Sequence, residues 1–164
     1  MADIYIALGG NLGDVLATFG RVLAALPERG IAVRETSRRY RTAALVPPGA
    51  PPGPDYWNAV VHAVTALSPH AVLERLLELE ARAGRVRRER WEARPLDLDL
   101  LLYGELVLRE PNLTLPHPRL AVRGFVLLPL ADVASRLVVP GLGATVRQLL
   151  ERLPEGERQA LEVR

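Results

Sequence analysis

The chain of 164 residues contains neither cysteine nor lysine. The absence of cysteine excludes disulfides, thiolate metal sites and cysteine nucleophiles. The absence of lysine excludes the lysine of a Walker-type phosphate loop and any Schiff-base chemistry. All 21 basic residues are therefore arginine. If the protein binds phosphate, it must use arginine, backbone N–H groups or a metal ion.

Long apolar runs are also absent, and no basic segment precedes the first strand-like residues, which begin at Asp3. We therefore expect no membrane span and no signal peptide, and we place the protein in the cytoplasm. The length predicts a single domain, residues 1–164, which can bury about 70% of its unfolded surface.

Hydrophobic spacing predicts strands alternating with helices. Ser68 followed by Pro69 is typical of a helix start, and Gly84 is the expected C-cap of that helix. The order β-α-β-β-α-β indicates an α+β fold with helices packed on an antiparallel sheet. The predicted strands are 3–8, 31–40, 57–65 and 96–103, with 105–108 pairing back across Gly104; the helices follow residues 14 and 68 and lie near 124–134 and 144–153.

Two long loops interrupt these elements. Residues 43–54 contain five prolines and two glycines, which excludes a regular helix or strand. Residues 85–95 form the second loop. Loops of this length in a compact domain are usually functional or disordered.

Asp97-Leu98-Asp99 is the sharpest chemical feature of the sequence. Residues two apart on a strand point to the same face, so the two carboxylates lie together while the flanking leucines face the core. Such a pair suits Mg²⁺, which takes a few protein oxygens and completes its shell with water and phosphate. The alternative is a pair of solvated acids on an exposed strand.

Arginines crowd the segment just before this acid pair. Residues 82–94 hold six arginines and two glutamates, although the net charge of the whole chain is only +2. Arginines for phosphate oxygens and acids for a metal are complementary parts of a nucleotide site. Trp91 in the same loop argues against a wholly solvated role, because a large aromatic side chain must stack or become buried.

Three further residues are candidates for ligand contacts. Tyr56 and Asn58 share a strand face, where an aromatic ring and an amide can hold a flat heterocycle. His117, between two prolines, lies in an extended loop from which its ring can reach a ligand. Taken singly, each has an ordinary structural explanation.

Together and in order, these segments resemble the hydroxymethyldihydropterin pyrophosphokinase family. The resemblance runs from residue 4 to about residue 133. Its most specific parts are the R-x-L-D-L-D block and the P-H-P block that leads to R-G-F. The matching segments are Ala7–Asp14, Tyr40–Thr42, Pro54–Val60, Gly84–Arg87, Glu89–Trp91, Arg94–Asp99 and Leu113–Phe125.

The resemblance implies a ferredoxin-like fold, in agreement with the element order, and a monomer. It implies that ATP donates a diphosphate to the hydroxymethyl oxygen of 6-hydroxymethyl-7,8-dihydropterin, releasing AMP, with two Mg²⁺ ions on the aspartates. It also implies the following residue roles. The metal and catalytic residues are Asp97 and Asp99, with Arg85 and Arg94 stabilising the phosphates; the pterin contacts are Thr42, Leu45, Tyr56, Asn58 and Phe125; the ATP contacts are Glu80, Arg87, Trp91, Arg94, Thr114, His117 and Arg123.

Several positions depart from the family pattern. Gly10 stands where serine is frequent, Ala43 and Ala44 replace common prolines, and the arginine-rich loop is one residue shorter than in some members. Leu77 and Asn112 stand where some members have polar or arginine contacts to ATP. Two other functions remain open: an RNA-binding module, which the pI of about 9.5 fits superficially, and a ligand-binding domain without catalysis. The strand 57–65 lacks the aromatic pattern of an RNA-binding sheet, and the acid pair would repel nucleic acid, so we expect no nucleic-acid partner and no membrane partner.

Overall fold

A computed structural model of the protein describes residues 1–43, 47–51, 53–84, 95–159 and 162–163. Within them, strands and helices follow the predicted β-α-β-β-α-β order and then continue with helices and short hairpins. The strands are β1 (Ala2–Gly10), β2 (Ile31–Thr36), β3 (Tyr40–Thr42), β4 (Tyr56–Thr65), β5 (Asp97–Tyr103), β6 (Leu108–Glu110), β7 (Leu113–Leu115), β8 (Val138–Val139), β9 (Ala144–Thr145) and β10 (Glu162–Val163). The helices are α1 (Val15–Ala25), α2 (Pro69–Arg82), α3 (Gly124–Ala134), α4 (Val146–Glu151) and α5 (Glu155–Gln159), with 3₁₀ turns η1 (Pro27–Arg29) and η2 (Leu120–Val122).

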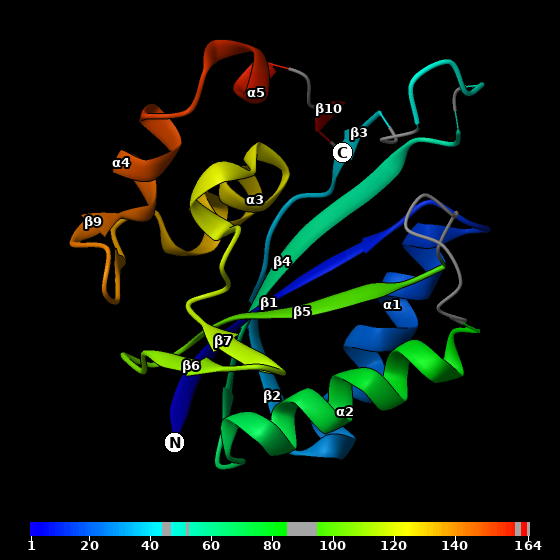
Figure 1. Ribbon diagram of the computed structural model, residues 1–164. Helices are drawn as coiled ribbons and strands as arrows, with labels where there is room; N and C mark the ends of the chain where they lie inside the picture. The colour runs from blue at the N-terminus through cyan, green and yellow to red at the C-terminus, as the bar shows by residue number, and fades with distance from the viewer. Residues whose placement is uncertain (44–46, 52, 85–94, 160–161, 164) are drawn as a thin grey trace.

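The main sheet is antiparallel, with strands in the order β10-β3-β4-β1-β5, and β2 also pairs with β4 (Figure 1). Counting β2 and β3 as one interrupted strand, the sheet has the order of a ferredoxin-like fold. The predicted strand 31–40 is therefore two strands, because the chain leaves regular pairing between Thr36 and Tyr40. The fold class is confirmed.

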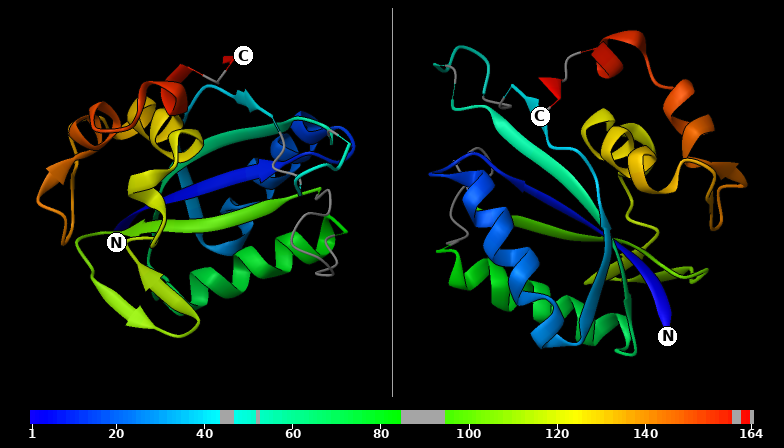
Figure 2. Two further views of the ribbon diagram at one scale, coloured as in Figure 1. Left: turned by 45° about the horizontal axis from the view of Figure 1, so that its top comes forward. Right: turned by 180° about the vertical axis from the view of Figure 1, so that it is seen from behind.

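Helices cover both faces of the sheet (Figure 2). On one face α1 and α2 bury a core that includes Phe19, Leu76 and the strand residue Ile6. On the other face α3 and α4 pack through Leu127 and Leu149. In Figure 1 α1 and α2 lie across one face of the sheet, whereas α3 and α4 are gathered toward one end of the other face.

The helix α2 begins as predicted. Ser68 is the N-cap and its hydroxyl accepts from the Ala71 N–H, with Pro69 in the first turn. At the other end the cap is Ala83 rather than Gly84. Gly84 follows it with φ of 87°, a left-handed conformation that glycine adopts without steric cost.

The predicted pairing of residues 105–108 with β5 is wrong. The chain turns away after Gly104, and β6 pairs instead with β7. The outer edge of β5 is occupied by other groups, since the Leu98 N–H donates to the Glu80 carboxylate and the Leu101 carbonyl accepts from the His117 N–H. No helix among the described residues is long and apolar enough to cross a membrane.

Candidate active site

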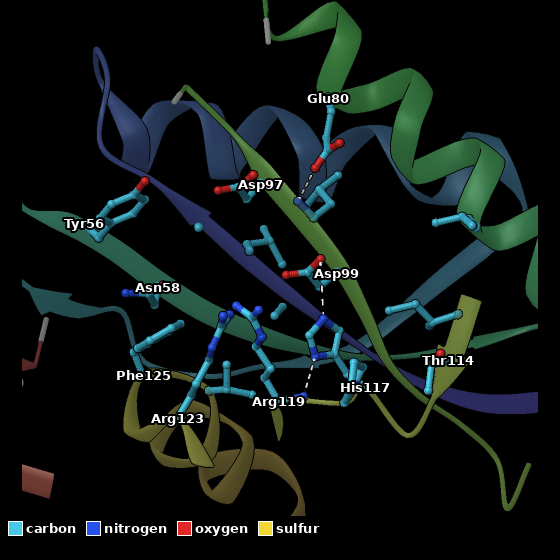
Figure 3. A pocket seen from close by; sticks show the side chains of 18 of the residues that line it. Tyr56, Asn58, Glu80, Asp97, Asp99, Thr114, His117, Arg119, Arg123 and Phe125 are labelled. Atoms are coloured by element: carbon cyan, nitrogen blue, oxygen red, sulfur yellow. Dashed lines mark hydrogen bonds and ion pairs between the residues drawn. The ribbon is translucent and has the colours of Figure 1, made fainter. Parts of the chain in front are cut away.

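One pocket, with a volume of about 610 Å³, opens at the uncovered end of the sheet. It is lined by every predicted site residue that the structure describes. Figure 3 labels all of these residues except Thr42. The remaining predicted residues, Leu45, Arg85, Arg87, Trp91 and Arg94, lie outside the described residues. The residues brought together are Thr42, Tyr56, Asn58, Glu80, Asp97, Asp99, Thr114, His117, Arg123 and Phe125.

The sheet forms the floor of this pocket. Gly9 of β1 pairs with Asn58 of β4 on one side and with Asp97 of β5 on the other, and Ala7 pairs in the same way with Asp99. A Cβ atom on Gly9 would lie 3.3 Å from the Asn58 Oδ1 atom. The small residues of β1 thus leave room for longer polar side chains on both neighbouring strands.

The two aspartates lie as the strand period predicts. Asp97 is half-buried and the side chain of Asp99 is 52% exposed, while Leu98 and Leu100 between and after them are buried in the core. Among the described residues no cluster of three or more acids, histidines or cysteines could enclose a metal ion. An open pair of carboxylates fits Mg²⁺, which keeps waters and phosphate oxygens in its shell, better than a metal held only by protein.

Glu80 lines the pocket and also holds the backbone of β5 in position. It is 4% exposed, and its Oε2 atom accepts a hydrogen bond of 2.7 Å from the Leu98 N–H. Because Leu98 lies between the two aspartates, this bond fixes the backbone that carries them. A buried carboxylate that accepts an amide hydrogen bond is also less costly than an unpaired one.

Asn58 is the polar residue at the other end of the floor. It is 8% exposed, and its Nδ2 atom has no hydrogen-bond partner among the described residues. A buried donor left unpaired costs free energy, so such a group usually awaits a ligand or a water. In Figure 3 the half-buried rings of Tyr56 and Phe125 flank this amide. The guanidinium of Arg123 lies over the Phe125 ring at 5.3 Å from its centroid.

His117 is held by its own loop. Its Nδ1 atom accepts from the Arg119 N–H at 3.2 Å, so the neutral ring carries its proton on Nε2, which lies 3.9 Å from the Asp99 Oδ1 atom. Burial lowers the pKa of His117, Asp99 opposes this shift, and Arg123 and Arg119 add to it. The ring is therefore a neutral hydrogen-bond donor near pH 7.

The pocket also contains residues that the sequence did not assign to it. Leu73 and Leu77, one helical turn apart on α2, form an apolar end together with Leu113. Their spacing alone signalled an amphipathic helix, because apolar residues that line a ligand pocket and apolar residues of a core follow the same period. For Leu77 the resemblance gave a second signal, since some family members contact ATP at that position. Arg119 also lines the pocket. Its position two residues after His117 was the available signal.

Comparison with known proteins agrees with this arrangement. The family model of 7,8-dihydro-6-hydroxymethylpterin-pyrophosphokinase (HPPK) matches residues 5–135. The chain is 43% identical over 149 residues to a 2-amino-4-hydroxy-6-hydroxymethyldihydropteridine pyrophosphokinase of Synechocystis, covering 90% of this chain and 74% of that one. It is 42% identical over 161 residues to the Methylorubrum extorquens protein of the same name, covering 95% and 97% respectively.

Longer proteins match in part. A mitochondrial folate synthesis bifunctional protein of Arabidopsis thaliana is 39% identical over 136 residues, which are 83% of this chain and 24% of that protein. The crystal structure of wild-type Plasmodium falciparum HPPK-DHPS with SDX-DHP superposes with a TM-score of 0.68 at 14% identity, over 93% of this chain and 43% of that chain. At that identity the superposition shows the fold alone. The family match and the relatives of similar length show that this chain belongs to the 7,8-dihydro-6-hydroxymethylpterin-pyrophosphokinase family.

Proposed function

We propose that this chain transfers the diphosphate group of ATP to 6-hydroxymethyl-7,8-dihydropterin, releasing AMP, in folate biosynthesis. Membership of the family supports this reaction. The observation that carries it is the pocket itself, in which a buried amide between two aromatic rings lies across one strand from a pair of carboxylates. The family match favours the enzyme over an RNA-binding or non-catalytic module.

The pterin would occupy the end of the pocket at Tyr56, Asn58 and Phe125. A flat heterocycle can stack on the aromatic rings, and the unpaired Asn58 amide can bond to its polar edge. Thr42 and Leu45 are the further proposed contacts. The Thr42 hydroxyl donates to the Ala43 carbonyl at 3.2 Å, so it can still accept a hydrogen bond from a ligand.

ATP would lie along β5 and β7, with its adenine toward Leu73, Leu77 and Leu113. Its phosphates would then reach the aspartates, with Thr114, His117 and Arg123 beside them. We assign Asp97 and Asp99 to two Mg²⁺ ions, which neutralise phosphate charge when bound. Outside the described residues, Arg87 and Trp91 are proposed ATP contacts, and Arg85 and Arg94 are proposed to stabilise the transferred group.

In the proposed step, the hydroxymethyl oxygen of the pterin attacks the β-phosphorus of ATP and loses its proton to water. The bond from that phosphorus to the bridging oxygen breaks, and AMP leaves with the electron pair. The chain contributes by placing the two substrates in line and by surrounding the phosphates with positive charge, which account for most of the catalysis in phosphoryl-type transfers. We further propose that the protein acts as a monomer in the cytoplasm.

The test is to measure AMP release from ATP by purified protein, with and without 6-hydroxymethyl-7,8-dihydropterin, in Mg²⁺ and in EDTA. AMP that forms only with both the pterin and Mg²⁺ is the expected result. Release of ADP would show ordinary phosphoryl transfer and overturn the reaction. AMP release that persists in EDTA would overturn the metal assignment.

A further inference from the structure

Arg119 has a backbone fixed by the pocket wall and a side chain that enters the pocket. Its N–H donates to the His117 Nδ1 atom at 3.2 Å, and the next residue, Leu120, is buried with 1% exposure at the start of η2. The Arg119 side chain lines the pocket and points into it in Figure 3. The anchored main chain thus limits where the guanidinium can go.

A second cation converges on the same space. Arg123 also lines the pocket and points into it (Figure 3). Among the described residues, the Arg119 guanidinium has no carboxylate within ion-pair distance. Like charges that converge in this way favour the binding of an anion between them.

The acids come from the sheet that forms the floor of the pocket. Asp97 and Asp99 project from β5, whereas Arg119 and Arg123 come from the segment leading into α3. A polyphosphate that shares metal ions with the acids still has oxygens free to accept hydrogen bonds from the arginines. A guanidinium, planar and rich in donors, matches such oxygens.

We propose that Arg119 is a phosphate-binding residue that contacts the phosphate chain of ATP from the segment leading into α3, while Asp97 and Asp99 approach it from β5. This inference rests on the proposed function, because it takes the ligand to be ATP. It gives Arg119 two separable roles, since the main chain holds His117 while the side chain holds phosphate.

The experiment compares Arg119→Ala and Arg119→Lys with the wild type in the AMP-release assay. Both variants keep the N–H that holds His117, so a loss of activity reports on the side chain. The control is Arg136→Ala, which removes the same charge from an exposed residue just beyond the far end of α3 and outside the pocket. Affinity for α,β-methylene-ATP with Mg²⁺, and for adenosine, is measured by calorimetry.

We expect Arg119→Ala to lower kcat/KM for ATP and affinity for the ATP analogue by about 10- to 100-fold, the effect of one lost charge-assisted hydrogen bond. Arg119→Lys should recover part of the loss, whereas adenosine affinity and the Arg136→Ala variant should match the wild type. If Arg119→Ala behaves like Arg136→Ala while the wild type releases AMP, the inference about Arg119 is wrong and the proposed function stands. A wild type that releases no AMP overturns the proposed function instead.

Discussion

Asn58 and Asp97 lie in register on opposite sides of Gly9, one on β4 and the other on β5. Because neighbouring strands are about 4.8 Å apart, their backbones are separated by about 10 Å. The hydrogen bonds of the sheet therefore fix the spacing between the amide proposed to bind the pterin and the carboxylate proposed to bind metal. Neither residue depends on a loop for its position.

Replacing Gly9 even by alanine, which adds only a methyl group, should disturb the site. In Gly9→Ala the new Cβ would lie 3.3 Å from the Asn58 Oδ1 atom and 3.9 Å from the Asp97 Cβ atom. We expect KM for the pterin to rise about tenfold as Asn58 is displaced, with a loss of about 1 kcal/mol in the free energy of unfolding. Steady-state kinetics with each substrate varied, together with chemical denaturation, measure these effects.

A matched control for this substitution is Gly20→Ala in α1, where an added Cβ meets nothing within 4 Å. It should raise the free energy of unfolding by about 0.5–1 kcal/mol, because alanine favours the helix, and it should leave KM unchanged. Equal kinetic effects at the two glycines would show that crowding at Asn58 is not the cause.

Asn58→Ala should weaken pterin binding while leaving the stability of the fold almost unchanged. The Nδ2 atom has no hydrogen-bond partner among the described residues, so removing this donor breaks no hydrogen bond to any of them. We expect the free energy of unfolding to change by less than about 1 kcal/mol and pterin affinity to fall about 100-fold, as two ligand hydrogen bonds are lost. Thermal melting and pterin-binding calorimetry measure both, and Asn112→Ala at the other end of the pocket is the control. A loss of stability without a loss of affinity would make Asn58 structural.

The isosteric change Asp99→Asn should stop the reaction without unfolding the protein. The Asp99 side chain is half exposed, and among the described residues its one ion-pair partner is His117 at 3.9 Å, so the substitution should cost little folding free energy. Removing a metal-binding carboxylate should lower kcat by about 1,000-fold. Asp97→Asn is expected to have a similar effect on kcat.

The control for the aspartates is Asp3→Asn, which removes a carboxylate at the other end of β1, where Asp3 pairs with His62 at 2.8 Å. It should retain AMP release. If Asp99→Asn releases AMP about as fast as Asp3→Asn at saturating Mg²⁺, then Asp99 is not a ligand of the proposed metal site.

Local patterns predicted the elements that position this site. The strand period placed Asp97 and Asp99 on one face and Leu98 in the core, and Ser68 with Pro69 marked the start of α2. The pairing of β6 with β7 could not be foreseen, because the edge of β5 is occupied by Glu80 and His117, which are distant in sequence. The structural role of Glu80 was hidden for the same reason, because its partner Leu98 lies 18 residues away in the sequence.

Tyr40 should contribute to the free energy of unfolding at neutral pH, and this contribution should be lost at high pH. The residue is buried on β3, and its hydroxyl donates to Asp132 of α3 and accepts from the Arg38 Nη2 atom at 3.0 Å. Burial, with the hydrogen bond to Asp132, raises the pKa of Tyr40 to about 12. The folded state thus favours the neutral phenol, and this contribution is fully present below the unfolded pKa of about 10 and is lost as pH rises from there through 12.

The variant Tyr40→Phe removes the hydroxyl and leaves the Arg38–Asp132 ion pair in place. At about pH 8 we expect it to be less stable than the wild type by about 1–2 kcal/mol, the worth of a buried hydrogen bond. Between about pH 10 and pH 12 the difference should shrink, because only the wild type loses stability when Tyr40 ionises. Urea denaturation of both proteins across this range measures it, and the other titrating groups cancel in the difference. A difference that stays constant to the highest pH would show that the phenol ionises equally readily in the folded and unfolded states.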